Sequence, residues 1–189
     1  YGTSGPRIIL RVFGGFGFAQ ADREARDIAA VGYRKGVPMG GELLRASTGK
    51  APALLIQAVK DPAGANLDRV QVIKGWRDAQ GAVHQQVINV AWSGARRLRR
   101  DGSLPAVGDT VDRQSARYAN SIGATELVTL WRDPEFSPDV AAFYYVRVLE
   151  IPTPRHQVFD ALALGIDPQA TGQPETLQER AWSSPIWYR

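Results

Sequence analysis

The sequence predicts a mainly β fold, a two-sheet, sandwich-like domain with one or two short helices and long loops. Roughly seven or eight short segments alternate apolar with polar residues or run continuously apolar, and both patterns are typical of β-strands. Turn-forming glycine, proline, asparagine and aspartate separate these segments at frequent intervals. Strands divided by turns, with little helix among them, are typical of a β-sandwich.

The first predicted strand covers residues 6–13, where Ile8, Leu10 and Val12 would line one buried face. The strongest strand prediction is for residues 141–151, which are rich in aromatic and β-branched side chains. Other strands are expected over residues 53–59, 67–76, 83–92, 126–131 and 181–188, the last at a sheet edge or a bulge because it contains a proline.

Two short helices are expected between these strands. Residues 22–31 space their apolar side chains as a helix does, and Gly32 would end that helix. Residues 156–164 follow two prolines and place their apolar side chains on one side of a helix or turn.

Two segments, residues 36–50 and the arginine-rich residues 93–107, are expected to be irregular. Residues 14–18 contain three glycines, as some phosphate-binding loops do. No Lys-Ser or Lys-Thr pair follows them and no strand–loop–helix unit surrounds them, so we interpret them as a bend with packed aromatic residues.

Composition limits the classes of protein and site. The chain has 189 residues, 44% apolar and 22% charged, which fits one globular domain with a sizeable core. It has no cysteine, which rules out disulfides, thiolate metal ligands and a cysteine nucleophile. No apolar run approaches the roughly 20 residues that span a bilayer. The net charge of +4 is small and spread along the chain, so we expect no nucleic-acid partner.

The densest positive cluster is formed by Arg96, Arg97, Arg99 and Arg100, which are the candidates for contacting an anion. A solvated loop is the alternative, and the cluster lacks the interleaved aromatic residues that would stack on bases.

No catalytic constellation is visible in the sequence, and no catalytic residue is assigned. The two histidines, His84 and His156, are too far apart to indicate a metal site. Asp61, Asn66 and Asp68 offer oxygen ligands that calcium could use, but they lack the spacing of a dedicated loop, and ordinary Asx turns are the alternative.

The tryptophans allow two interpretations. They could form a platform on which a sugar stacks, or they could belong to the core, as tryptophan more often does in an all-β domain. The five residues are Trp76, Trp92, Trp131, Trp182 and Trp187.

Several segments carry a resemblance to a known family. They are YGTSGPRI at residues 1–8, RVFGGFGF at 11–18, GVPMGGEL at 36–43, DPAGANLDRVQVIKGW at 61–76, VAWSG at 90–94, VGDTVD at 107–112, AFYYVRVLEIPTPR at 142–155 and QERAWSSPIWY at 178–188. Through these segments nearly the whole chain resembles the carboxyl-terminal part of a bacterial family catalogued as a domain of unknown function, number three-six-zero-four.

The resemblance implies a larger protein. Full-length relatives resemble metal-dependent hydrolases of the polymerase-and-histidinol-phosphatase (PHP) type, whose ligands, including an early His-x-His element, precede the segment that matches residues 1–8. This chain has no His-x-His, so no metal ligand is carried over. We expect residues 1–189 to be one β-rich domain, with residues 1–8 at the junction to an upstream metal-binding domain that holds a divalent metal.

The resemblance also implies a position for several residues. Tyr1, Thr3 and Ser4 would lie near the rim of the upstream active site. The seam with the upstream domain is expected at four residues of the last predicted strand, Trp182, Ile186, Trp187 and Tyr188.

The expected function is that of a non-catalytic β-domain that shapes or covers the active site of a phosphoester, ester or carbamate hydrolase. The alternative is a module that binds a ligand or glycan through exposed tryptophan and arginine. No cofactor is expected in this chain itself, and relatives suggest a periplasmic or secreted protein, with the cytoplasm as the alternative.

Overall fold

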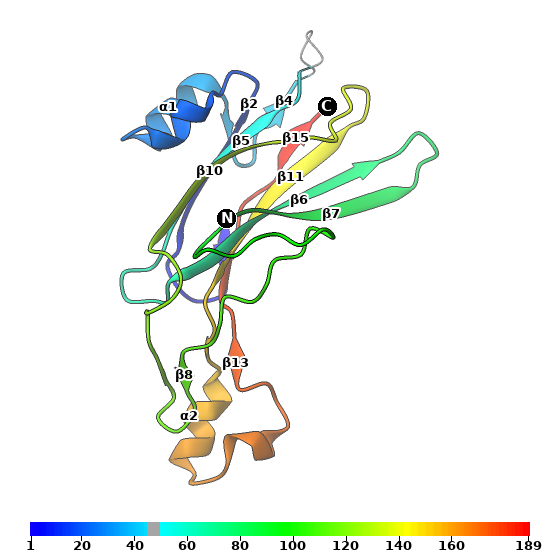
Figure 1. The fold of residues 1–189 in the computed structure, drawn as a ribbon. Coiled ribbons are helices and arrows are strands. Elements are labelled where there is room, and N and C mark those ends of the chain that lie inside the picture. The colour runs from blue at the N-terminus through cyan, green and yellow to red at the C-terminus, as the bar shows by residue number, and fades with distance from the viewer. Residues whose placement is uncertain (45–49) are drawn as a thin grey trace.

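The computed structural model describes residues 1–44 and 50–189. Two β-sheets face each other across a shared core, and helix α1 (Ile28–Lys35) forms a further layer outside one of them (Figure 1). The mainly β, two-sheet architecture with short helices confirms the fold class that the sequence predicts. Residues 45–49, part of the segment expected to be irregular, lie outside the described residues.

The four-stranded sheet, called sheet B here, is antiparallel throughout. Its order is β10 (Glu126–Arg132), β5 (Ala53–Val59), β2 (Ile9–Gly15) and β3 (Val37–Pro38). Strands β10 and β5 pair along their whole length, and so do β2 and β5.

The larger sheet, called sheet A, is built around β11 (Ala142–Glu150), which pairs on one side with β6 (Leu67–Arg77). Strand β7 (Val83–Trp92) continues the sheet beyond β6. On its other side β11 pairs with two short strands in succession, β14 (Arg180–Trp182) and β15 (Ile186–Tyr188). Their outer neighbours are β1 (Gly2–Thr3) and the parallel strand β4 (Glu42–Leu43).

Alternation along the strands builds the core between the sheets. Sheet B contributes Leu10, Val12, Leu54 and Ile56, and sheet A contributes Val70, Val72, Tyr144, Val146, Val148, Ile186 and Tyr188, all nearly or completely buried. The residues between them along each strand point to the outer faces of the two sheets.

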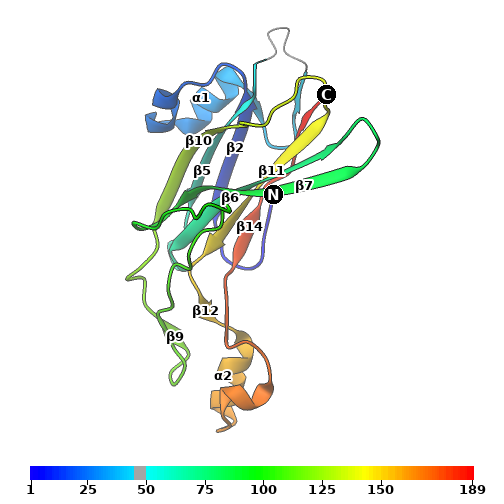
Figure 2. The ribbon, with the colours of Figure 1, turned by 45° about the vertical axis from the view of Figure 1, so that its right-hand side comes forward.

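A lobe hangs from one end of the sandwich, at the bottom of both views (Figures 1 and 2). It holds helix α2, the 3₁₀ segment η2 and four two-residue strands. Their bounds are β8 (Val111–Asp112), β9 (Arg117–Tyr118), β12 (Thr153–Pro154), α2 (His156–Ala163), η2 (Pro168–Thr171) and β13 (Thr176–Leu177). The ion pair of Arg113 with Glu175, 2.6 Å between Nε and Oε2, joins the two halves of the lobe.

The helix expected over residues 22–31 is displaced in the structure. The Asp27 side chain accepts a hydrogen bond from the backbone N–H of Ala30, 2.9 Å away, and so starts α1 there. The preceding residues form a separate 3₁₀ segment, η1 (Gln20–Glu24). The second predicted helix is confirmed as α2.

Three local predictions are corrected. The segment expected to be irregular from residue 36 contains the short strand β3. Strand β2 continues through Gly15, whose missing side chain admits the Lys35 carbonyl: a Cβ there would lie 2.7 Å from that oxygen. The single strand expected over residues 181–188 is two strands, because the Ser183 hydroxyl, in place of its carbonyl, accepts the hydrogen bond of the Val146 backbone N–H, at 2.9 Å.

Candidate functional site

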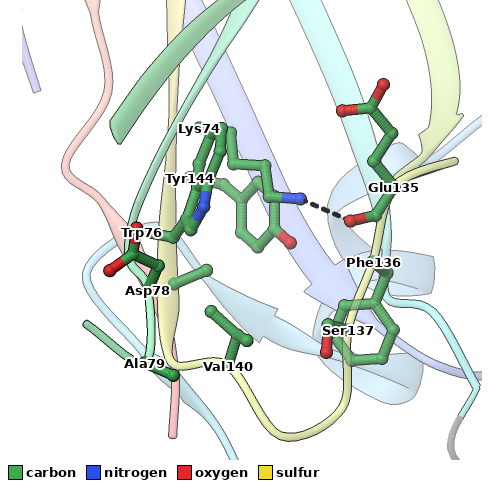
Figure 3. Close-up of a pocket in the computed structure, with 10 residues that line it drawn as sticks. Lys74, Trp76, Asp78, Ala79, Glu135, Phe136, Ser137, Val140 and Tyr144 are labelled. Atoms are coloured by element: carbon green, nitrogen blue, oxygen red, sulfur yellow. Dashed lines mark hydrogen bonds between the residues drawn. The ribbon is translucent and has the colours of Figure 1, made fainter. Parts of the chain in front are cut away.

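A pocket of about 170 Å³, called the end pocket, lies where the two sheets diverge at the end of β6 (Figure 3). Lys74 and Trp76 enter it from β6, and Tyr144 enters from β11. The loop between β10 and β11 closes it with Phe136 and Val140.

The polar end of this pocket is a buried triad. Lys74 Nζ lies 2.6 Å from Asp133 Oδ2 and donates a second hydrogen bond to the Glu135 carbonyl, 2.9 Å away. Tyr144 donates its hydroxyl proton to the same Asp133 oxygen at 2.6 Å. Burial, and then the hydrogen bond to Asp133, raises the pKa of Tyr144, so the phenol stays a neutral donor.

The rim of the end pocket is aromatic and polar. The Trp76 ring lies 5.1 Å from the Lys74 ammonium and stacks on His84, with ring centroids 5.2 Å apart. His84 Nε2 lies 2.6 Å from Asp78 Oδ2, and this hydrogen bond lowers the pKa of Asp78. The pocket therefore has an ion pair at its inner end, the Asp78 carboxylate beside His84 at its rim, and aromatic walls.

A second concave surface lies on the opposite, outer side of sheet A. Phe143, Tyr145, Trp182 and Trp187, called the open face here, stand on this side because they alternate with the buried residues of β11, β14 and β15. The Phe143 ring is stacked with Tyr145, with centroids 6.5 Å apart, and is tilted by 52° against Trp187, with centroids 5.2 Å apart.

Beside the open face runs a groove of about 380 Å³. Gly75, Val83, Phe143 and Trp187 form its apolar lining, and the guanidinium groups of Arg77 and Arg189 belong to its edge. In the described part of the chain the helices have their main contacts elsewhere: α1 packs on β2 and β3, and α2 packs on η2. The aromatic half of the outer face thus has no helix over it.

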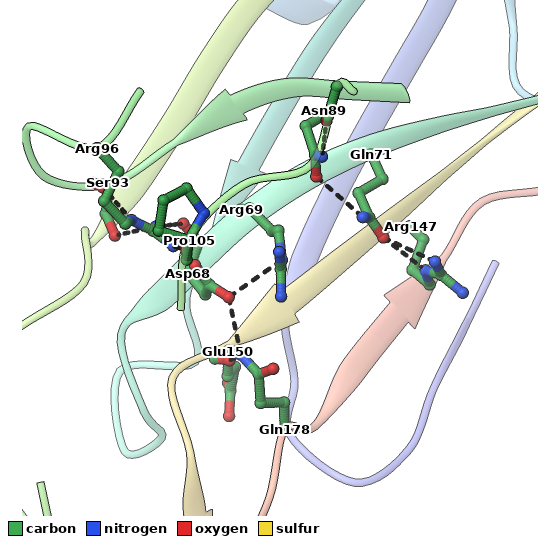
Figure 4. A network of polar contacts seen from close by, with 11 residues as sticks. Asp68, Arg69, Gln71, Asn89, Ser93, Arg96, Pro105, Arg147, Glu150 and Gln178 are labelled. Carbon is green, nitrogen blue, oxygen red and sulfur yellow. Dashed lines mark hydrogen bonds and ion pairs between the residues drawn. The ribbon is translucent and has the colours of Figure 1, made fainter. Parts of the chain in front are cut away.

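A buried polar network occupies the other end of sheet A (Figure 4). Asp68 is fully buried, and its carboxylate lies 2.6 Å from Arg96 Nη2 and 3.2 Å from Arg69 Nε. Gln178 donates to Asp68 Oδ2 at 2.8 Å and to the Glu150 carbonyl at 2.7 Å. These contacts tie the loop that follows β7 and the segment that returns from the lobe to the sheet.

Glu150 is a buried carboxyl group of this region whose pKa is raised. It is 2% exposed, and one of its oxygens has no hydrogen-bond partner among the described residues. Burial, and then the nearby carboxylates of Glu179 and Asp61, raises the pKa of Glu150 to about 7.

The arginine cluster predicted to contact an anion is divided by the structure. Arg96 forms an ion pair with the buried Asp68 and also donates to the Pro105 carbonyl at 3.0 Å, so its guanidinium is engaged within the domain. Its charge is neutralised inside the protein. Arg97, Arg99 and Arg100 are exposed.

The oxygen-rich turn is an Asx turn in part. Asp61 accepts from the backbone N–H of Arg7 at 2.8 Å and of Ala63 at 3.0 Å, whereas the Asn66 amide donates to two backbone carbonyls. Asp68 belongs to the buried network. Across residues 1–44 and 50–189 no three His, Cys, Asp or Glu side chains are grouped so that they could hold a metal ion.

The four residues predicted at the seam lie on two sides of sheet A. Ile186 and Tyr188 are 0% and 1% exposed and point into this domain's own core, whereas Trp182 and Trp187 stand on the outer face. The residues predicted at an active-site rim, Tyr1, Thr3 and Ser4, are exposed at the edge of sheet A, where Gly2 pairs with Trp182 and Ser4 binds Glu179 through its hydroxyl.

The tryptophans do not gather into one platform. Trp76 lines the end pocket, Trp131 packs on the core beside Tyr144, and Trp92 donates to the Arg96 carbonyl at 2.8 Å. Only Trp182 and Trp187, of the five, share the open face. His84 belongs to the rim of the end pocket and His156 begins α2.

The sequence interpretation missed Lys74 and Tyr144. One feature could have found the first of them, because Lys74 continues the inward-facing alternation of Val70 and Val72, and an inward lysine requires a buried partner.

Comparison with known proteins identifies the family. The family profile described as "Protein of unknown function (DUF3604)" matches residues 1–189, and the chain belongs to this family. No curated protein and no solved structure matches it significantly. Within the described residues no helix is long and apolar enough to cross a membrane.

Proposed function

We propose that this chain is a non-catalytic β-domain of a metal-dependent hydrolase and that its open face packs against the upstream hydrolase domain. The observation that carries the proposal is the apolar groove beside Phe143 and Trp187, which no described helix covers. Exposed apolar surface that is contiguous and concave is typical of a protein–protein contact.

The partner is proposed from the position of β1. Gly2 pairs with Trp182 at the edge of sheet A, so a polypeptide preceding Tyr1 would leave the domain beside the open face. The family's resemblance to PHP-type hydrolases supplies the chemistry of that domain. Any divalent metal is assigned to it, because the described residues of this chain offer no grouped ligands.

The composition of the groove fits a partner within the same protein. Its lining is apolar apart from Arg77 and Arg189, and both guanidiniums have partners: Arg77 donates to the Gly81 carbonyl at 2.9 Å, and Arg189 lies 3.3 Å from Glu42. A contact here would gain mainly from burial of apolar surface, as interfaces between permanent partners do.

Hydroxyl-radical footprinting of the full-length gene product and of residues 1–189 tests the proposal. We expect the rings of Phe143 and Trp187 to be oxidised readily in the short chain and protected in the long one. Tyr33, 68% exposed on α1, is the internal control and should react equally in both. Equal oxidation of Trp187 in the two proteins would contradict the proposed contact.

A second measurement tests the absence of catalysis in this chain. We expect purified residues 1–189 to hydrolyse no phosphoester, ester or carbamate substrate, with or without added divalent metal. Hydrolase activity that co-purifies with this chain and resists chelation would overturn the proposal.

A further inference from the structure

We propose that the end pocket binds a single neutral sugar ring between Trp76 and Phe136. Neither residue belongs to the open face, although Trp76 and Ala142 line both the end pocket and the groove beside that face. The pocket is enclosed by β6, β11 and the loop between β10 and β11, and its walls and polar ends suit the two kinds of surface that a sugar presents. A pyranose has apolar C–H faces and hydroxyl groups around its edge.

The strand register leaves one side of Trp76 free. Trp76 stands between two cross-strand neighbours on the same face of sheet A, His84 on β7 and Ala142 on β11. The imidazole stacks on the indole from one side, at an interplanar angle of 17°. On the other side Ala142 carries only a methyl group, so the indole borders the pocket.

Phe136 forms the opposite wall (Figure 3). Its ring is held edge-on against the buried Tyr188, with centroids 4.9 Å apart and planes at 75°. Both aromatic walls are thus supported by neighbouring rings, and little ordering of side chains is needed when a ring enters between them.

The inner end of the pocket offers a donor. An ammonium group has three N–H donors, and two of those of Lys74 are used by Asp133 and the Glu135 carbonyl. The third has no partner among the described residues, and the ammonium lies at the inner end of the pocket beside the Tyr144 phenol (Figure 3). A ligand hydroxyl can accept this hydrogen bond.

The rim offers an acceptor and sets the charge of the ligand. Asp78 and Glu135 are the acidic residues that line the pocket, and the Lys74 ammonium is already paired with the buried Asp133. A hydroxyl that donates to Asp78 is favoured there, whereas an acidic sugar would meet repulsion that is not offset. The site therefore selects a neutral sugar.

The size of the pocket limits the ligand to one ring. A volume of about 170 Å³ is smaller than the roughly 300 Å³ at which drug-sized ligand sites begin. A ring of about twelve non-hydrogen atoms in such a site binds with a dissociation constant of about 1 mM.

Titration of residues 1–189 with glucose, galactose, mannose and glucuronate, followed by amide and indole NMR, tests the site. We expect saturable shifts of the Trp76 indole N–H and of the amides near Val140 with at least one neutral hexose, and at least tenfold weaker binding of glucuronate. Absence of saturable shifts with all three neutral hexoses would overturn the proposal. Glucuronate binding as tightly as glucose would overturn the assignment to neutral sugars.

Two variants fill the pocket from different elements, so one misfolded variant does not decide the test. Ala142→Leu fills it from β11 and Val140→Phe from the loop, and each should weaken hexose binding at least tenfold. Trp187→Ala, on the other side of sheet A, is the matched control and should bind as the unchanged chain does. Hexose binding that survives both filling variants would place the sugar elsewhere and refute the assignment.

Discussion

The outer faces of the two sheets differ in how their aromatic side chains are covered. On sheet B, Phe13 is 3% exposed because α1 lies over it, with Ile28, Val31 and Phe18 completing a small second core. On sheet A, Phe143 occupies a corresponding outward position, but no described helix covers it and Trp187 beside it is 37% exposed.

A glycine lies against each of these two phenylalanines. A Cβ on Gly32 of α1 would lie 2.3 Å from the Phe13 ring, and a Cβ on Gly75 of β6 would lie 2.3 Å from the Phe143 ring. Each ring therefore occupies the space that a side chain at the glycine would fill. One ring is covered by α1 of the same chain, and the other is covered by no described helix, so the open face is apolar surface that the described residues leave partly exposed.

Removing the ring from the covered face should have the largest effect. We expect Phe13→Ala to lower the free energy of unfolding by about 3–5 kcal/mol, because it leaves a cavity under α1 that the helix cannot fill. Urea unfolding followed by circular dichroism measures the loss. A loss below about 1 kcal/mol would show that α1 is not a fixed cover.

The buried Glu150 should make the stability of the domain depend on pH, whereas the exposure of the open face should not depend on it. The pKa of Glu150 is raised to about 7 in the folded protein from 4.5, so the folded state holds this proton more tightly than the unfolded state. Its contribution to stability is present below about pH 4.5 and is lost as pH rises through 7, by about 3 kcal/mol.

Urea unfolding at pH 5 and pH 8 checks this dependence in the unchanged chain and in Glu150→Gln. We expect the variant to lose most of the decline in stability between the two pH values. The groove beside the open face is lined by no carboxylate or histidine, so footprinting of Trp187 in the full-length protein should be the same at both. If the free energy of unfolding of Glu150→Gln falls between pH 5 and pH 8 as much as that of the unchanged chain, the pH dependence comes from another group.

Substitution of Gly32 and of Gly75 by alanine should have smaller and unequal effects on stability. Gly32→Ala should destabilise by about 1–2 kcal/mol, because the Phe13 ring cannot retreat and the overpacking exceeds the gain in helix propensity. Gly75→Ala should change stability by less than about 0.5 kcal/mol, because Phe143 can swing outward into solvent. Thermal unfolding of both variants measures the difference, and equal losses would mean that Phe143 is as confined as Phe13.

The smallest effect on stability is expected at the centre of the open face. Trp187→Ala should cost less than about 1 kcal/mol in residues 1–189, since the side chain gains only partial burial against Phe143 and Arg189. The contact proposed above, between the open face and an upstream domain, predicts that the same change in a longer gene product speeds limited proteolysis between the two. A larger loss in the short chain would make Trp187 a core residue.

Most of the strands could be predicted because their alternation is strong. The boundaries of β5 and β7 agree with the sequence prediction to the residue. The errors have local causes: the start of α1 depended on the Asp27 cap, and the break before β15 depended on a serine hydroxyl that replaces a strand partner.

The end pocket was not predictable as a site. Lys74, Asp133 and Tyr144 lie on three elements, and only the pairing of β6 with β11 and the turn after β10 bring them together. The open face was predicted in part, through Trp182 and Trp187. The burial of Ile186 and Tyr188 follows from the alternation of a three-residue strand, which is too short to give a pattern in the sequence.

The pairing of Gly2 with Trp182 has a consequence for biosynthesis. While the chain is being synthesised, one edge of β11 stays unpaired until residues 180–188 leave the ribosome. Strand β1 also has no partner until then, because it pairs with β14. Contacts between segments so distant in the sequence form slowly, and an unpaired strand edge is prone to aggregate meanwhile. Folding of this domain is therefore completed only after residues 180–188 have been synthesised, and shortening it by its last ten residues would leave its central strand permanently open on one side.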